Sequence, residues 1–186
     1  MMRIVIFFFC IIGLIACSSR LANVDNRVTI KVDSIYVNEV EKSDTVRHEP
    51  MIVYYCTFKS LTDSTVDIQV QDYSSEVKPE ANFYLINSKD TLNLYLATNK
   101  SIKVPSKGEF HFGLATNTFN MVDLFEKYGY SVEHRSKPNK VNEVEFFKKI
   151  ARESFILFEW GGNKREIRDL EKIKVSYRDP NDNTVD

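Results

Sequence analysis

Apolar and polar residues alternate along much of the first half of the chain. Val28, Ile30 and Val32 are separated by polar residues, and the alternation resumes one position out of step at Ile35. A period of two is typical of a strand with one buried face, and the change of step predicts a β-bulge. We therefore expect a first strand that begins near Val28 and contains a bulge before Ile35.

Further short strands separated by turn residues are expected from the same pattern. They cover residues 52–58, 66–70, 83–85, 92–96, 102–104, 110–114, 155–160 and 173–177. Both faces of the segment 52–58 carry apolar or aromatic residues, which predicts a central strand. The charged segment 39–49 is expected to be a loop, and the segments 83–85 and 92–96 are expected to form a hairpin.

Helical spacing replaces this alternation after residue 116. The apolar residues that recur on one face are Phe119, Val122, Phe125 and Tyr128. Gly129 follows at a position suited to a helix end, and Asn142 and Glu145 have the form of a capping box before a second amphipathic stretch. Two short helices are therefore expected near residues 118–152, inserted among the strands.

Strands of this length with short turns indicate a mainly β fold. The segment 58–63 and the Ile-x-Val-Pro and Phe-x-Phe steps of the segment 102–112 resemble immunoglobulin-like sandwiches found in small bacterial lipoproteins. The resemblance implies an immunoglobulin-like antiparallel β-sandwich with a two-helix insertion. A transthyretin-like sandwich with appended helices is the alternative, and it resembles the outer-membrane lipoprotein of type VI secretion assemblies.

The first sixteen residues have the layout of a secretory signal. Arg3 gives a basic start, and Ile4 to Ile15 form an uncharged apolar run. At about 1.5 Å of rise per residue this run covers roughly 18 Å as a helix, which is short of the ~30 Å hydrocarbon core of a bilayer. We therefore expect residues 1–16 to be a signal peptide that is removed.

The run ends in Leu14-Ile15-Ala16-Cys17, which resembles the lipobox of bacterial lipoproteins. The resemblance implies that Cys17 is acylated, becomes the first residue of the mature protein and holds the domain to a membrane through its lipid. Because one acyl chain binds marginally and several bind durably, the anchor is expected to be stable. The alternative is an ordinary cleaved signal in which Cys17 has no role.

The residues after Cys17 indicate the destination. Ser18 fits sorting to the outer membrane, and the segment 18–24 contains no acidic residue. In the Bacteroidota, acidic residues at this place mark lipoproteins for the cell surface, so the resemblance implies a periplasm-facing outer-membrane lipoprotein, with the cell surface as the alternative. The remaining parts are residues 17–27 as the acylated start and tether, 28–178 as a single β domain and 179–186 as a polar tail.

Charge and cysteine content limit the partners and the disulfide bonds that can be expected. The formal net charge is −1, which does not indicate a nucleic-acid partner. The segment 135–174 is net positive, which fits a solvated face or a contact with anionic lipid head groups or an acidic partner. Once Cys17 is acylated, Cys56 is the remaining thiol of the mature chain, so no internal disulfide is expected.

A triplet of Asp, a hydroxyl residue and then an aliphatic residue or Thr occurs four times. It resembles the O-glycosylation acceptor of exported Bacteroidota proteins, which implies glycans on the hydroxyl residues. These are Ser34, Thr45, Ser64 and Thr91. The alternative is that Asp-Ser and Asp-Thr steps simply start strands and turns, because their short side chains bond to the local backbone.

Motifs for catalysis or metal binding are not found in the sequence. His48, His111 and His134 lie far apart, and none has a second ligand at metal-binding spacing, so no metal and no cofactor are expected. Phosphate-binding loops and nucleophile elbows are also not found, and no catalytic residue is expected. The candidate contact residues are aromatic residues beside turn glycines, namely Tyr128, Tyr130 and Trp160.

The sequence therefore predicts a lipid-anchored, periplasm-facing, non-catalytic module that binds a protein partner within a cell-envelope assembly. The alternative is an enzyme or enzyme inhibitor that acts on envelope polymers, with a site assembled only by the fold. The deepest cleft discriminates between the two. Two carboxylates, or a histidine and an acid, favour catalysis there, whereas a flat aromatic patch favours binding.

Overall fold

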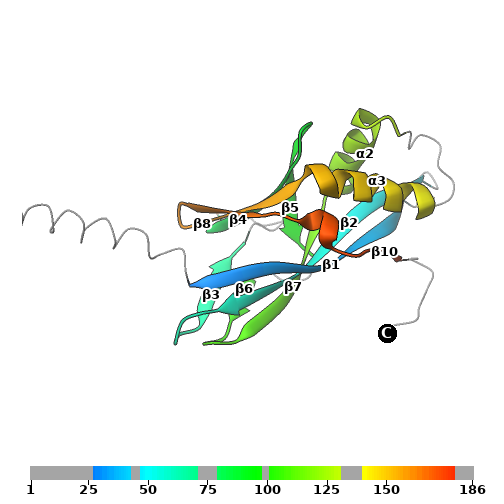
Figure 1. The fold of residues 1–186 in the computed structure, drawn as a ribbon. Helices are drawn as coiled ribbons and strands as arrows, with labels where there is room; N and C mark the ends of the chain where they lie inside the picture. The colour runs from blue at the N-terminus through cyan, green and yellow to red at the C-terminus, as the bar shows by residue number, and fades with distance from the viewer. Residues whose placement is uncertain (1–26, 43–46, 71–78, 98–100, 131–139, 179–186) are drawn as a thin grey trace, which may run out of the picture.

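The computed structural model describes residues 27–42, 47–70, 79–97, 101–130 and 140–178, which form ten strands, two α-helices and one short 3₁₀ helix (Figure 1). The elements are β1 (Val28–Lys42), β2 (Arg47–Ser60), β3 (Val66–Gln69), β4 (Ala81–Ile86), β5 (Thr91–Leu96), β6 (Ser101–Val104), β7 (Glu109–Thr116), α2 (Thr118–Lys127), α3 (Lys140–Glu153), β8 (Phe155–Trp160), β9 (Asn163–Ile167), η1 (Leu170–Lys172) and β10 (Val175–Arg178). The expected signal peptide, nearly all of the tether and the tail from residue 179 lie outside the described residues.

Eight of these strands form one sheet in the order β10-β1-β2-β7-β5-β4-β8-β9, and β3 pairs separately with β6. β10 runs parallel to β1, whereas the other paired strands are antiparallel. β7 pairs with β5 through Leu114, Ala115 and Thr116, and the sheet curls at this short pairing. The arm of β4, β5 and β8 therefore faces the arm of β1, β2 and β7 (Figure 1). The mainly β prediction is confirmed, in the form of a curled sheet.

The predicted bulge in β1 is confirmed. The pairing of β1 with β2 shifts between Val32 and Ser34, so Asp33 is an extra residue in the strand. The extra residue reverses the alternation of side chains. Val32 and Ile35 are consequently both buried in the core, while Asp33 is exposed on the outer face of the sheet.

The prediction of a loop over residues 39–49 is wrong. β1 continues to Lys42 and β2 begins at Arg47, so most of this segment is a paired two-stranded ribbon. Backbone hydrogen bonds hold such a ribbon, so no alternation of apolar and polar residues in the sequence marks it. The sequence pattern does not predict β9 either, because Asn163–Ile167 is an edge strand whose mostly polar residues give little apolar alternation.

The two arms of the curled sheet meet through four phenylalanines. Phe58 and Phe112 stack with ring centroids 5.0 Å apart on the β2–β7 arm, and Phe83 and Phe158 stack at 4.7 Å on the β4–β8 arm. Phe58 also contacts Phe158 edge to face at 5.4 Å, which joins the two pairs. Such aromatic pairs contribute about 0.5–1.5 kcal/mol each beyond their buried area, so this cluster holds the arms together.

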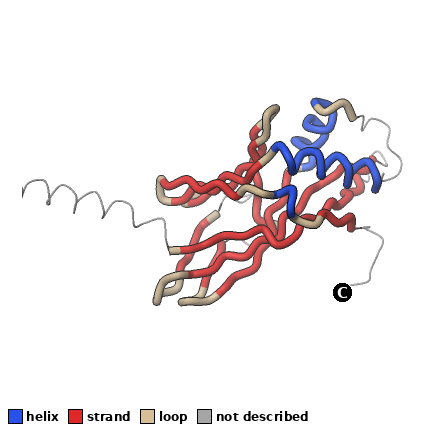
Figure 2. Tube along the Cα trace, in the orientation of Figure 1, coloured by secondary structure: helices blue, strands red, loops and turns tan. Residues whose placement is uncertain are grey.

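The two predicted helices are confirmed, and they cover the end of the concave face farthest from the β8–β9 turn (Figure 2). Phe125 of α2 and Phe146 of α3 lie with ring centroids 3.8 Å apart, which fixes the helices to each other. Phe147 of α3 contacts the ring of Tyr54 on β2 at 5.7 Å. The helices therefore complete the hydrophobic core.

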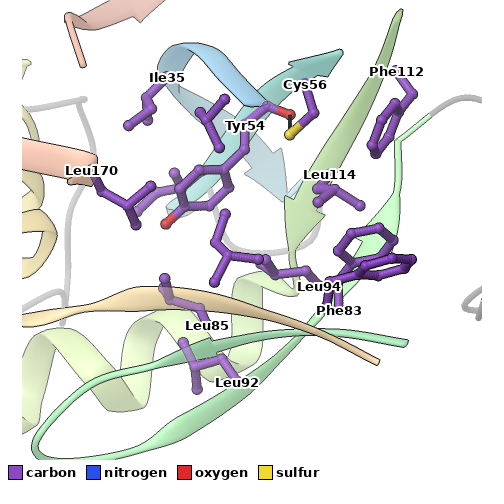
Figure 3. Packing of buried hydrophobic residues seen from close by; sticks show 14 of the residues in the cluster. Ile35, Tyr54, Cys56, Phe83, Leu85, Leu92, Leu94, Phe112, Leu114 and Leu170 are labelled. Atoms are coloured by element: carbon purple, nitrogen blue, oxygen red, sulfur yellow. Dashed lines mark hydrogen bonds between the residues drawn. The ribbon is translucent and has the colours of Figure 1, made fainter. Parts of the chain in front are cut away.

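Tyr54 is a polar residue at the centre of this core. Its side chain is fully buried, and its hydroxyl points toward Leu170 (Figure 3). The hydroxyl has no hydrogen-bond partner among the described residues. Burial, with a smaller contribution from Cys56, raises the pKa of Tyr54 well above its ordinary value, so the group stays neutral.

We predict that Tyr54→Phe raises the free energy of unfolding by about 1 kcal/mol, because it removes a buried hydroxyl that lacks a partner while keeping the ring. Urea unfolding of the two proteins measures the difference. Tyr54→Ala is the matched control and should lower the free energy of unfolding by about 3–5 kcal/mol, since it leaves a cavity. A clear loss of stability in Tyr54→Phe would contradict the prediction.

Candidate functional site

The outer face of β1, β2 and β7 carries an apolar stripe. We call Tyr36, Val53, Tyr55 and Ala115 the outer-face stripe. Tyr36 lies opposite Val53, and Val53 lies opposite Ala115, so the stripe crosses the three strands. Val53 and Ala115 are buried although their strand neighbours Tyr54 and Leu114 face the core. The sheet therefore has a small apolar cluster of its own on the side away from the core.

Two tyrosines give this stripe its exposed surface. The rings of Tyr36 and Tyr55 pack edge to face with their centroids 5.2 Å apart. Tyr55 is 40% exposed, which is unusual for a large hydrophobic residue here. Gly113 lies opposite Tyr55, and a Cβ at Gly113 would lie only 3.1 Å from the Cβ of Ala97. Gly113 is itself buried, so a side chain there would crowd Ala97.

A polar row borders the stripe on the same three strands. Thr57 of β2 donates a hydrogen bond from its hydroxyl to the carboxylate of Asp33, and the Nδ1 atom of His111 on β7 lies 2.8 Å from the same hydroxyl oxygen. Because the threonine proton goes to Asp33, His111 is the donor in the second bond. Lys31 adds an ion pair to Asp33 at 2.9 Å.

The order of these groups decides what they can do chemically. In a nucleophilic triad the imidazole lies between the hydroxyl and the carboxylate and takes the hydroxyl proton. Here the Thr57 hydroxyl lies between Asp33 and His111, and it gives its proton to the carboxylate. The row is therefore suited to holding side chains in place and to hydrogen bonding with a partner, not to activating a nucleophile.

The hydrogen bonds of the row also set the charge of Asp33. Partial burial works against the carboxylate, but the bond from Thr57 and the nearby Lys31 ammonium outweigh it and lower the pKa of Asp33 below 3.8. A lowered folded-state pKa contributes stability above the unfolded value, and that contribution is lost as the pH falls through the folded-state pKa. Since Asp33 is exposed, the contribution is below about 1 kcal/mol.

We predict that Thr57→Val raises the pKa of Asp33 toward its ordinary value, because the carboxylate loses its hydroxyl donor. A carboxyl NMR titration of Asp33 measures the change. Thr65→Val, at an exposed position in the turn after β2, is the control and should leave the titration of Asp33 unchanged. An Asp33 titration that is the same in Thr57→Val and in the unaltered protein would disprove the assigned bond.

A groove lies where the two ends of the curled sheet approach each other. β10 pairs with Ile35–Asn38, and among the described strands none pairs with this edge of β1 before Ile35. β8 and β9 come close to that edge. The groove is lined by Arg27, Val28, Ile30, Phe158, Trp160, Asn163 and Arg165, and its empty volume, including space open to solvent, is about 370 Å³. Its lining is cationic and aromatic.

Two arginines form the polar part of this groove. The Arg27 guanidinium lies 4.5 Å from the ring centre of Trp160, and Nη1 of Arg165 donates to the carbonyl oxygen of Val28 over 3.1 Å. A guanidinium over an indole is a favourable cation–π arrangement. The candidate contact residue Trp160 is therefore half-buried at the rim of the groove, with an arginine over its ring.

The candidate contact residues Tyr128 and Tyr130 are more buried than expected for aromatic residues on a turn beside Gly129. Tyr128 is only 9% exposed, and its hydroxyl donates to Glu153 over 2.9 Å. Tyr130 is half-buried, with its ring 5.3 Å from that of Phe146. Gly129 has a φ of 83°, which turns the chain back onto the helices and explains this placement.

The structure describes three of the four candidate glycosylation residues. Ser64 and Thr91 are exposed, in the turn after β2 and at the first residue of β5. Ser34 is half-buried in the middle of β1, next to the bulge. Thr45 and the lipidation residue Cys17 lie outside the described residues.

Other features of the described part of the chain bear on its chemistry. No three metal-ligating side chains gather there. Cys56 is free and buried, and burial, followed by the charge of Asp33, raises the pKa of its thiol. No helix among these residues is long and apolar enough to cross a bilayer. The thiol of Cys56 is thus a core group and not a reactive one.

No protein-family model, no curated protein and no solved structure matches this chain.

Proposed function

We propose that the protein is a lipoprotein of the bacterial outer membrane, anchored by lipid on Cys17, whose β domain faces the periplasm and binds a protein partner in an envelope assembly without catalysing a reaction. The lipobox and the short apolar run before it support the anchor. The outer-face stripe supports the binding role, and it is the observation that carries the proposal.

The composition of the stripe suits a protein contact. Tyrosine is enriched in the buried centres of interfaces because it combines a large apolar ring with one hydrogen-bonding group. Tyr36 and Tyr55 already pack against each other, so little side-chain freedom is lost when a partner covers them. The row of Asp33, Thr57 and His111 supplies a polar rim beside them.

An enzyme or enzyme inhibitor acting on envelope polymers is the second candidate. Cleavage of such polymers needs two acids, or a histidine and an acid, that converge on a cleft. The groove at Trp160 is lined by arginine, asparagine and apolar groups, and His111 lies on the open sheet face with Thr57 between it and Asp33. Both observations favour binding over catalysis.

A relationship to immunoglobulin-like sandwiches stays part of the proposal, as does the alternative likeness to the outer-membrane lipoprotein of type VI secretion assemblies. The facing arms of the curled sheet support a sandwich-like architecture.

We predict that Cys17→Ser abolishes incorporation of labelled palmitate in living cells and gives an uncleaved or soluble product, because the acylated thiol is lost. Cys56→Ala is the matched control and should still incorporate the label, since Cys56 is buried in the core. Fractionation and autoradiography measure both outcomes. Palmitate incorporation that survives in Cys17→Ser would refute the anchor.

We predict that a photo-crosslinking residue in place of Tyr55 forms one discrete adduct with an envelope protein in living cells. The same residue in place of Lys148, which is exposed on α3, is the control and should form none. Tyr36→Ala in the Tyr55 crosslinking background should reduce the adduct strongly, because it removes the neighbouring ring. Adducts that are the same from both positions, or none from Tyr55, would remove the stripe as the contact surface.

A further inference from the structure

One end of the domain gathers apolar, polar and cationic side chains, of which Arg27 and Leu61 are exposed and the others half-buried. We call Arg27, Leu61, Trp160, Asn163 and Arg165 the Trp160 end. The Leu61 amide donates to the carbonyl oxygen of Arg27 over 2.8 Å, and Arg27 in turn covers the ring of Trp160. Leu61 is 52% exposed, the larger exposure of the two large hydrophobic residues that stand open in the described part of the chain.

The positive charge of this end is not fully neutralised within the described residues. Lys59, Lys107 and Lys164, which lie near it, are paired with Glu109, Asp63 and Glu159 at 3.2, 2.5 and 2.5 Å. Arg27 and Arg165 form no ion pair with a carboxylate in the described ranges. Glu80, which is exposed and precedes the β4 residue paired with Trp160, offsets one of the two guanidinium charges. This end therefore has an excess of about one positive charge, and each guanidinium has free N–H groups.

The position of this end in the fold points to what covers it. β1 begins at Val28, and the β8–β9 turn lies at the same end of the molecule, away from the helices (Figure 1). Arg27 lies ten positions after Cys17, so even a fully extended connection spans at most about 33–36 Å. A lipid on Cys17 would thus keep this end closer to the bilayer than the helical end.

We infer that the Trp160 end docks on the surface of an anionic phospholipid bilayer. Arg27 and Arg165 bind the phosphates of the head groups, for which a guanidinium is a bidentate donor. Trp160 and Leu61 enter the interfacial layer, where indole rings are favoured because they have an apolar body and one polar group. The inference rests on the anchor of the proposed function, but it concerns a different surface from the outer-face stripe.

The glycines of the β8–β9 turn fit this contact. Gly161 and Gly162 have φ values of 57° and 82°, a conformation that residues with a side chain rarely adopt. The turn directly after Trp160 is therefore narrow and carries no side chain. It allows the backbone to approach the head groups closely.

Trp160 is the single tryptophan of the chain, so protein fluorescence reports on this end alone. The full-length lipoprotein, purified from membranes, is reconstituted into phosphatidylcholine vesicles with or without phosphatidylglycerol, in each case with brominated acyl chains as quenchers. We expect a blue shift and stronger quenching of Trp160 in the vesicles with phosphatidylglycerol.

Charge-removing variants test the role of the arginines. Arg27→Gln with Arg165→Gln should reduce the phosphatidylglycerol-dependent quenching strongly, since each basic residue near an anionic surface contributes about fivefold to binding. Lys148→Gln with Lys172→Gln, two exposed lysines at the helical end, is the matched control and should keep it. If the double variant unfolds, Arg27→Gln alone, at an exposed position, tests whether the arginines bind the anionic head groups.

Vesicle flotation keeps the two proposals apart. Protein that floats with both kinds of vesicle while Trp160 stays unquenched would overturn the docking inference and leave the anchor standing. Quenching that does not depend on phosphatidylglycerol would also overturn it, and would favour a protein partner at this end. Protein that does not float with phosphatidylcholine vesicles would overturn the anchor. In that case, quenching of Trp160 by vesicles with phosphatidylglycerol would still support docking, and the absence of such quenching would overturn it.

Discussion

The packing of the Phe58–Phe112 pair against the Phe83–Phe158 pair is the interaction on which the rest of the structure depends. β2 and β7 supply one pair and β4 and β8 the other, so the cluster brings the two arms of one curled sheet face to face. Closure of the sheet buries the core on the concave side. It also leaves an outer face on the side away from the core, and a groove where the start of β1 approaches β8 and β9.

The bulge at Asp33 connects this architecture to the outer face. Without an extra residue, the alternation that buries Val32 would place Ile35 outside and Tyr36 in the core. With the bulge, Ile35 is buried and Tyr36 lies beside Tyr55 on the outer face. One inserted residue therefore sets both the polar row at Asp33 and the aromatic contact next to it.

Local pattern predicted much of this fold, because alternation and helical spacing report which face of each element is buried. The bulge before Ile35 and both helices follow from it. The pairing of Glu39 with Pro50 and the edge strand Asn163–Ile167 could not be predicted in this way. Backbone hydrogen bonds form both, and no apolar alternation in the sequence marks them. The contact of Arg27 with Trp160 could not be predicted either, because residues far apart in sequence meet there only when the sheet closes.

The two proposed surfaces are compatible with each other in one orientation. β1 rises by about 3.3 Å per residue, so Tyr36, eight residues after Val28, lies roughly 26 Å along the strand from the Trp160 end. Docking of that end on a bilayer would hold β1 pointing away from the membrane, with the outer-face stripe clear of the head groups. The anchor and the docked end would together fix the height and tilt of the domain above the bilayer. The domain would then lose less orientational freedom when a partner binds Tyr36 and Tyr55, which favours binding even through a modest contact area.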